Sequence, residues 1–241
     1  MKIYVSCARC AHEGRPTQMY PLEFRDDSRY SVPCPVGHHN VIILNAQKFE
    51  LLFDIGAHAI LDNYYREAVS SFTASLERTY EFFIKACFFE RNSEQAAEAA
   101  WRKISNQSER QLGAFIVLHS YETGTLPALL RDKDVQFRNE VIHKGRIPSR
   151  NEAVAYGTAV LEVIRSIVRE VRNRYPNGML KTMVAHNVAS RRPEDPKDLI
   201  AGFQVGTIVS LTVTGEEYNS RPFPEALRIL ELIRQQTSIY G

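Results

Sequence analysis

The sequence predicts a mainly α-helical fold with a small β region at its N-terminus and a mixed extension at its C-terminus. From about residue 57 to residue 174, apolar residues recur at intervals of three and four, as in amphipathic helices. Residues 1–50 instead hold short β-prone runs separated by polar turns. We therefore expect three regions, namely residues 1–50, 57–174 and 175–241.

The N-terminal region contains two strand candidates. Ile3–Val5 and Val41–Leu44 are short, apolar and rich in β-branched residues. Gly14 and Pro16 lie in the polar stretch between them, which is typical of turns. We expect both runs to form strands that flank this stretch.

A long amphipathic helix is expected at the start of the central region. Its apolar stripe steps by three or four positions, which places one face against a core. The stripe consists of Tyr65, Val69, Phe72, Leu76, Tyr80, Phe83 and Cys87. Because Cys87 lies on this stripe, we expect a buried and inert thiol rather than a nucleophile. A second helical stretch runs from Glu94 to about Tyr121, with an interruption near residues 105–108.

A short helix over residues 135–144 follows a loop that contains Gly124 and Pro127. Asp134 is its expected N-cap, and Gly145 is expected to end it. The helix that follows begins with a capping pattern of its own.

The last long helix of the central region begins with a capping box. Ser149 is the cap, and Glu152 lies three residues later. The helix runs to about Arg174, and the Pro-Asn-Gly sequence at 176–178 ends it. Beyond it we expect a polar loop, a strand and a terminal amphipathic helix. These lie at residues 191–198, at residues 207–214, and around Phe223, Leu227, Leu230 and Ile233.

Composition sets limits on function without choosing one. The 30 Lys and Arg residues nearly balance 28 Asp and Glu, and the net charge of +2 neither supports nor excludes binding to RNA. Three of the four cysteines lie within the first 34 residues, which does not suit a disulfide framework. The chain shows no signal peptide and no apolar run of the roughly 20 residues that span a bilayer. We expect a cytoplasmic protein without membrane contact.

Four residues of the N-terminal region have the spacing of a metal site. Cys7 and Cys10 form a C-x-x-C pair, and Cys34 is followed by His38 after a turn that contains Gly37. Zinc prefers four such soft or borderline ligands in a tetrahedron, and two tight turns with two ligands each provide them. We expect one structural zinc ion, which would stabilise a region too small to fold on its own apolar core.

The fourth ligand has an alternative, since His39 lies next to His38 and would serve equally from the sequence. The arrangement resembles a zinc ribbon, in which such sites are usually structural. Four protein ligands leave no open position for catalysis. Zinc-dependent hydrolysis is further disfavoured because the chain has no H-E-x-x-H helix.

The short helix carries a polar cluster next to an apolar face. Asn139 and His143 are four residues apart, so they lie close together on one side, and Arg138 is adjacent. Asn139 can orient the imidazole by a hydrogen bond. His143 also lies in the last turn, where the helix dipole favours the imidazolium. The alternative is that the histidine only caps the helix and the arginine is an ordinary surface residue.

These side chains suit the cleavage of RNA, which supplies its own nucleophile in the 2′-hydroxyl. The reaction needs a proton acceptor, a proton donor to the leaving 5′-oxygen, and a cation beside the phosphorane. One histidine and one arginine provide these without a metal. A second pair from another protomer would complete the acid and base set.

The segment Arg138-Asn139-x-x-x-His143 resembles the R-x4-H signature of HEPN-domain ribonucleases. The setting over residues 57–174, with two long helical stretches before a short motif helix and one after it, is also similar to that family. The resemblance implies a helical bundle, a homodimer that brings two motifs into one cleft, and metal-independent cleavage of single-stranded or loop RNA. Arg138 and His143 match the catalytic pair, and Asn139 matches the polar position between them.

The resemblance also implies a role as a toxin or antiviral effector, and we expect an inhibitory or activating protein partner. Some toxin members carry a tyrosine two residues after the histidine as a site of inhibitory modification, and this chain has Gly145 there. We therefore expect no silencing at that position. The alternative function is a non-catalytic module that binds nucleic acid or protein and carries a structural zinc.

Overall fold

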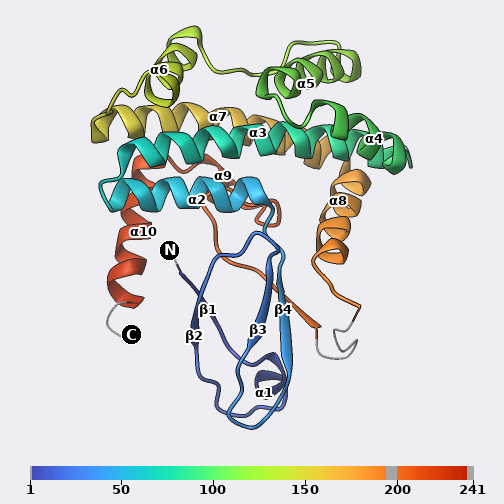
Figure 1. Cartoon of the computed structure of the whole chain (residues 1–241), viewed down its shortest axis with the longest axis vertical. Helices are drawn as coiled ribbons and strands as arrows, with labels where there is room; N and C mark the ends of the chain where they lie inside the picture. The colour runs from blue at the N-terminus through green and yellow to red at the C-terminus, as the bar shows by residue number, and fades with distance from the viewer. Residues whose placement is uncertain (1, 194–199, 238–241) are drawn as a thin grey trace. The chain divides into compact units, whose positions relative to one another are not determined.

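The structure, a computed structural model, describes residues 2–193 and 200–237 (Figure 1). Contacts between Cα atoms divide the chain into two compact units. The first unit comprises residues 1–47 and 183–206, and the second comprises residues 48–182 and 207–241. The stretch after residue 175, which we expected as a separate extension, is thus shared between the two units.

The first unit begins with a two-stranded antiparallel sheet. Strand β1 (Lys2–Val5) pairs with β2 (Tyr20–Glu23), so that Ile3 lies opposite Leu22. The short helix α1 (Ala8–His12) separates them in sequence. The strand predicted at the start of the chain is confirmed, and its apolar side chains are buried in this unit.

A second sheet of the first unit has the strand order β3-β4-β5. Its strands are β3 (Arg29–Val32), β4 (Asn40–Leu44) and β5 (Ile200–Phe203). The central strand β4 runs antiparallel to β3 and parallel to β5, and all five of its residues are buried. Burial on both faces explains why residues 41–44 are continuously apolar rather than alternating. The predicted strand at 41–44 is confirmed, whereas β5 was not foreseen.

The second unit is helical. Its helices are α2 (Lys48–Leu61), α3 (Tyr65–Glu90), α4 (Glu94–Ile104), α5 (Ser108–Thr123), α6 (Asp132–His143), α7 (Arg150–Arg174), α9 (Glu216–Ser220), α10 (Phe223–Thr237) and the first half of α8 (Pro176–Ala189). The predicted long helix, the break near residues 105–108, the capping box of α7 and the terminal helix are all confirmed.

Helix α3 occupies the centre of the second unit, with α2 on one side and α5 and α6 on the other (Figure 1). Rings from three helices meet in its core. The centroid of Phe72 lies 4.8 Å from that of Phe53 and 5.5 Å from that of Phe223. Gly56 and Gly157 make room for them, since a Cβ on Gly56 would lie 2.5 Å from the Phe72 ring. Truncating such a ring typically costs about 3–5 kcal/mol.

Two helix starts differ from the prediction. Helix α2 begins at Lys48 rather than near residue 57. The sequence pattern missed its first turns because the acidic Glu50 and Asp54 lie on its buried face and interrupt the apolar periodicity. Helix α6 begins at Asp132, so Asp134 lies inside the first turn and is not the N-cap. Its carboxylate pairs with Arg131 at 2.7 Å and favours the positive end of the helix dipole.

The Pro-Asn-Gly sequence after α7 also begins a new helix, since Pro176 is the first residue of α8. Proline suits the first helical position, where its missing N–H is not needed. The prediction that this sequence ends α7 is confirmed, because α7 stops at Arg174. The new helix that follows was missed.

The strand predicted over residues 207–214 is wrong, because this segment is irregular. Buried carboxylates of α2 take the place of a neighbouring strand. The Leu211 N–H donates to Glu50 and the Ile208 N–H donates to Asp54, both at 2.8 Å. Side chains therefore satisfy backbone groups that a sheet would otherwise pair.

The loop predicted over residues 191–198 lies partly outside the described residues, and residues 191–193 are not helical. No helix in the described part of the chain is both long enough and apolar enough to cross a membrane.

Candidate metal centre and motif helix

The first unit brings three cysteines and a histidine together. Cys7 follows β1 and caps α1, where its Sγ accepts the Cys10 N–H at 3.3 Å. Between β3 and β4, the Gly37 N–H donates to the Cys34 carbonyl oxygen at 2.9 Å, and Gly37 has a φ of 85°. This left-handed turn, which suits glycine, returns His38 toward the sulfurs.

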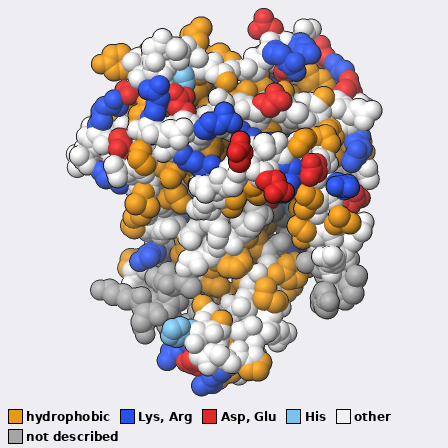
Figure 2. All heavy atoms as spheres, turned by 180° about the vertical axis from the view of Figure 1, so that it is seen from behind, with side chains coloured by type: hydrophobic (Ala, Val, Ile, Leu, Met, Phe, Trp, Pro, Cys, Tyr) orange, Lys and Arg blue, Asp and Glu red, His pale blue; other side chains and the backbone are white. Residues whose placement is uncertain are grey.

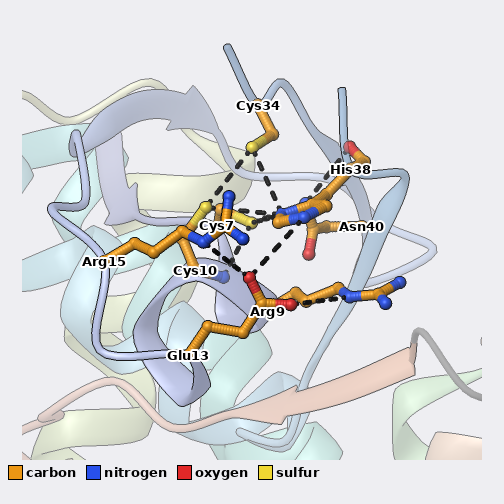
Figure 3. Close-up of polar contacts among 8 residues, drawn as sticks. All are labelled: Cys7, Arg9, Cys10, Glu13, Arg15, Cys34, His38 and Asn40. Atoms are coloured by element: carbon orange, nitrogen blue, oxygen red, sulfur yellow. Dashed lines mark hydrogen bonds and ion pairs between the residues drawn. The ribbon is translucent and has the colours of Figure 1, made fainter. Parts of the chain in front are cut away.

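The four ligand atoms converge (Figure 3). The Nδ1 atom of His38 lies 3.5 Å from the Cys7 sulfur, 3.4 Å from Cys10 and 3.6 Å from Cys34. All four atoms lie within 4.8 Å of one another, so the group can hold a metal ion. His39 is exposed and outside the group. The structure therefore places His38, and not His39, in this group.

Two side chains that the sequence did not single out surround this group. The Asn40 amide donates to the Cys7 sulfur at 3.0 Å, and Glu13 Oε2 lies 3.9 Å from His38 Nε2 (Figure 3). Such neighbours orient metal-binding ligands and set the histidine tautomer. Their only signal in the sequence is that each polar residue lies two or three positions after a ligand.

Glu13 is kept ionised by two arginines. A hydrogen bond from Arg9 at 3.1 Å, with Arg15 at 2.9 Å, holds the pKa of Glu13 below its usual range. The carboxylate therefore favours a proton on His38 Nε2, which leaves the Nδ1 lone pair directed at the sulfurs.

The neighbouring sulfurs are close enough to oppose the ionisation of Cys10. The Cys10 and Cys34 sulfurs are 3.5 Å apart. Burial, followed by hydrogen bonding and charge from Cys34 and Cys7, raises the pKa of the Cys10 thiol to about 12. A divalent cation would remove this opposition, because thiolates bind metals and their charges cancel.

Cys87 lies apart from this group, in the core of the second unit. It is fully buried, and burial raises the pKa of its thiol to about 12. A thiol in this state is a poor nucleophile. The expectation of an inert cysteine agrees with these surroundings.

In the second unit, the motif helix α6 is held against the core by its apolar face. Val141 is fully buried, and the Phe137 ring packs 5.7 Å from the Tyr156 ring of α7. Tyr156 in turn shares a hydrogen bond of 2.9 Å with Thr73 of α3. The polar side chains of the motif are thus carried by a helix whose rotation is fixed.

The turn from α6 to α7 is fixed by charge. Arg146 bonds to Glu140 of α6 and to Glu152 of α7, and its guanidinium lies 5.1 Å from the Phe137 ring centroid. Gly145 adopts a φ of 73° at the end of α6, which glycine tolerates. Glu152 also completes the capping box with Ser149. These contacts fix the position of the end of α6, where His143 lies, relative to α7.

Arg138 points into a cavity of about 250 Å³ formed by side chains of α3, α5, α6 and α7 and of the loop before α6. Its Nε atom is buried and has no hydrogen-bond partner. Glu77 also lines the cavity and interacts electrostatically with Arg138. Burial raises the pKa of Glu77, and Arg78 and Arg138 lower it by less. Glu77 and Tyr156 are neighbours of Arg138 that the sequence did not indicate.

His143 is exposed at the last position of α6. Within the described residues, no hydrogen bond joins it to Asn139 or to Arg138, so the orienting bond we expected from Asn139 is not formed. One chain therefore holds the arginine in a cavity and the histidine at the surface. The two are on one helix, and no hydrogen bond joins them in the described part of the chain.

The carboxylates near Arg138 do not form a metal site. Glu77, Glu109 and Asp132 line the same cavity. In the described part of the chain, the Cys7, Cys10, Cys34 and His38 group is the one whose ligand atoms converge. On the face drawn in Figure 2, acidic and basic side chains are interspersed among the described residues. Contacts with a polyanion on this face would rest on individual residues rather than on a broad basic field.

Comparisons of this chain with protein-family models, with curated proteins and with solved structures found no match.

Proposed function

We propose that this protein is a metal-independent endoribonuclease that cleaves single-stranded or loop RNA as a homodimer. The observation that carries the proposal is the state of Arg138, whose buried Nε atom has no partner while the same helix presents an exposed His143. Buried polar atoms are normally satisfied, so an exception needs an explanation, and a catalytic role is one. A role as a toxin or antiviral effector in the cytoplasm, with a regulatory protein partner, follows from the resemblance to HEPN ribonucleases.

The proposed chemistry assigns one task to each side chain. His143 takes the proton from the 2′-hydroxyl or gives one to the leaving 5′-oxygen, and its exposure lets substrate reach it. Arg138 stabilises the charge that develops on the phosphorane. Asn139 contacts the substrate or the partner's motif, because it makes no bond to His143 within one chain.

A second protomer is part of this proposal because one chain holds Arg138 at a cavity and His143 at the surface, with no hydrogen bond between them. Large apolar side chains are exposed on both sides of α6 in the sequence. Leu126 is 77% exposed before it, and Ile147 is 84% exposed after it, while Tyr121 at the end of α5 is 84% exposed. Contiguous apolar patches, unlike apolar residues scattered singly, mark surfaces that bind a partner, and we propose that these three residues belong to one such patch. A dimer through this surface would cover them and bring two copies of α6 together.

We also propose that zinc is the metal of the first unit. A tetrahedron with Zn–S bonds of about 2.3 Å and Zn–N bonds of about 2.0 Å has S–N edges of roughly 3.5 Å and S–S edges of roughly 3.8 Å. The edges from His38 Nδ1 measure 3.4–3.6 Å, and one S–S edge measures 3.5 Å. With four protein ligands, this metal would have a structural role.

The second candidate is a non-catalytic binding module. One observation favours it, namely that Glu77 lines the same cavity and offers Arg138 an opposite charge, as in an ordinary structural setting. In that case His143→Ala would leave the function of the protein unchanged.

The test is cleavage of a structured RNA in the presence of EDTA by the wild type and by matched variants. We expect His143→Ala to lower the rate by about a hundredfold or more through the loss of acid–base catalysis. His12→Ala, which removes another exposed histidine, is the control and should cut at the wild-type rate. Products should end in a 2′,3′-cyclic phosphate or its hydrolysis product. Equal rates for the two variants would support the binding module instead.

A further inference from the structure

A cavity of about 480 Å³ lies between α7 and the segment of residues 208–220 in the second unit. Three arginines of α7 line it, namely Arg165, Arg169 and Arg172. They are spaced four and three residues apart, so they lie on one face of the helix. Nothing in the proposed cleavage reaction uses this cavity.

Two of these arginines are fixed by uncharged partners. Arg165 donates to the carbonyl oxygens of Arg221 at 2.8 Å and Tyr218 at 3.3 Å, and Arg172 donates to that of Leu211 at 3.2 Å. A carbonyl orients a guanidinium without cancelling its charge. Burial lowers the pKa of both arginines, because water solvates them less than it would at the surface.

Few acids oppose this charge. Glu216 lines the cavity and is exposed. Arg172 is also influenced by the buried Glu50, and Arg165 by Glu162. Arg169 is exposed and makes no hydrogen bond or ion pair in the described part of the chain, so its whole fork of donors faces the cavity and solvent.

The remaining lining suits the rest of a small ligand. Val168 and Ile208 supply apolar surface, and Asn173 supplies an exposed amide. Cavities of about 300–1,000 Å³ with mostly apolar walls and a few directed polar groups are typical of small-molecule sites. Arginine forks match the oxygens of phosphate in a bidentate manner.

We propose that this cavity binds a nucleotide, with its phosphate on Arg169 in the positive field of Arg165 and Arg172, and its base against Val168 and Ile208. A small ligand is favoured over the RNA substrate by position. In Figure 1, α9 and α6 lie on opposite sides of α3, so a strand cut at α6 has no need to enter this cavity. The proposal does not rest on the ribonuclease activity.

The test is a calorimetric titration of the full chain carrying His143→Ala, so that RNA stays intact throughout. The probes are ADP, inorganic pyrophosphate, adenosine and a single-stranded RNA. We expect ADP to bind at least as tightly as pyrophosphate, and adenosine to bind at least about tenfold more weakly than ADP, because charge-assisted bonds to phosphate are the strong ones. ADP should also raise the melting temperature, since a ligand that binds only the folded state stabilises it.

A pair of charge reversals locates the site. Arg169→Glu should weaken ADP at least about tenfold, and it should fold normally because the side chain is exposed. Arg102→Glu makes the same change at an exposed position of α4 and should leave ADP binding within about twofold of wild type. Binding of RNA without ADP, no binding of either, or equal losses in the two variants would overturn the proposal.

Discussion

The metal centre and the motif helix differ in how complete each is within one chain. In the first unit, Cys7, Cys10, Cys34 and His38 place all their ligand atoms within 4.8 Å of one another. In the second unit, Arg138 points into a cavity while His143 is exposed, and no bond joins them. The first site needs only an ion to complete it, whereas the second needs another molecule, which we propose is a second protomer.

This difference explains what kind of sequence signal each site leaves. Metal ligands must converge on one point, so tight turns between strands fix their spacing. A site shared between protomers places no such demand on its own helix. Spacing alone therefore identified the metal ligands, while the motif helix depended on a family resemblance.

The largest effect is expected from removing a metal ligand. Cys7→Ser should reduce bound zinc from one ion per chain to none and unfold the first unit, because the metal supplies much of its folding free energy. The second unit should keep its helical circular dichroism, because Cys7 belongs to the first unit and is not part of the core of the second. Elemental analysis gives the zinc content, and Cys87→Ala is the control that should retain the ion. Protein purified with no stoichiometric zinc would show that the first site is not what we propose.

The neighbours of the ligands should matter less than the ligands. Glu13→Gln removes the carboxylate 3.9 Å from His38 Nε2 and should lower zinc affinity by about 10–100-fold. Competition with a chromophoric chelator measures this change. Glu23→Gln, which neutralises an exposed acid of β2, should leave the affinity unaltered. Equal affinities for the two variants would mean that Glu13 has no role in orienting the histidine.

The site at the motif helix α6 should be sensitive to a surface substitution that does not affect the metal centre. Leu126→Asp places a charge on the apolar surface beside α6 and should weaken the dimer at least about tenfold. Light scattering over a dilution series measures this, with RNA cleavage falling in parallel. Val213→Asp, at a less exposed apolar position, is the control and should remain dimeric. A wild-type protein that cleaves at full rate as a monomer would contradict the shared site.

The smallest effect concerns the pH dependence of the helical unit. Burial raises the pKa of Asp54 to about 8, well above its unfolded value. Its contribution to stability is fully present below the unfolded pKa and is lost as pH rises through about 8. Asp54→Asn keeps an acceptor for the Ile208 N–H. The free energy of unfolding of the variant, measured against that of the wild type, should be about 1–3 kcal/mol higher at pH 9 than at pH 5. Chemical denaturation at both pH values gives the free energies, and identical pH profiles for wild type and variant would refute the assignment.

We expect the two units to differ in their response to pH as well. Acid should release a metal from the first unit, because its thiolates and imidazole must be deprotonated to bind. Alkali should weaken the second unit, because Asp54 ionises there. We expect both units to be intact together only over an intermediate range.

Much of the fold was predictable because local patterns decide it. The stripe on α3, the capping box at Ser149 and the run of β4 each specify one element. The irregular segment 207–214 was not, because carboxylates of α2, about 150 residues earlier in the chain, satisfy its backbone. β-propensity predicts a strand only when a neighbouring strand is there to pair with.

The candidate sites show the same limit. Spacing indicated Cys7, Cys10 and Cys34 but left His38 and His39 open as the fourth ligand, whereas Glu13 and Asn40 were missed because nothing local marks their direction. At the motif helix, i to i+4 spacing suggested a bond between Asn139 and His143 that the structure does not form. The neighbours of Arg138 were missed because Glu77 lies about 60 residues away in sequence.

The most direct test of the central claim uses one RNA oligonucleotide prepared in two forms, all-ribose and with a single 2′-deoxy nucleotide at the mapped cut site. Both are incubated with the purified wild-type protein in EDTA, and the products are separated by denaturing electrophoresis. A reaction that uses the substrate's own 2′-hydroxyl predicts cleavage of the first RNA and survival of the second at that position. Efficient cutting of the 2′-deoxy substrate would contradict the mechanism proposed for Arg138 and His143.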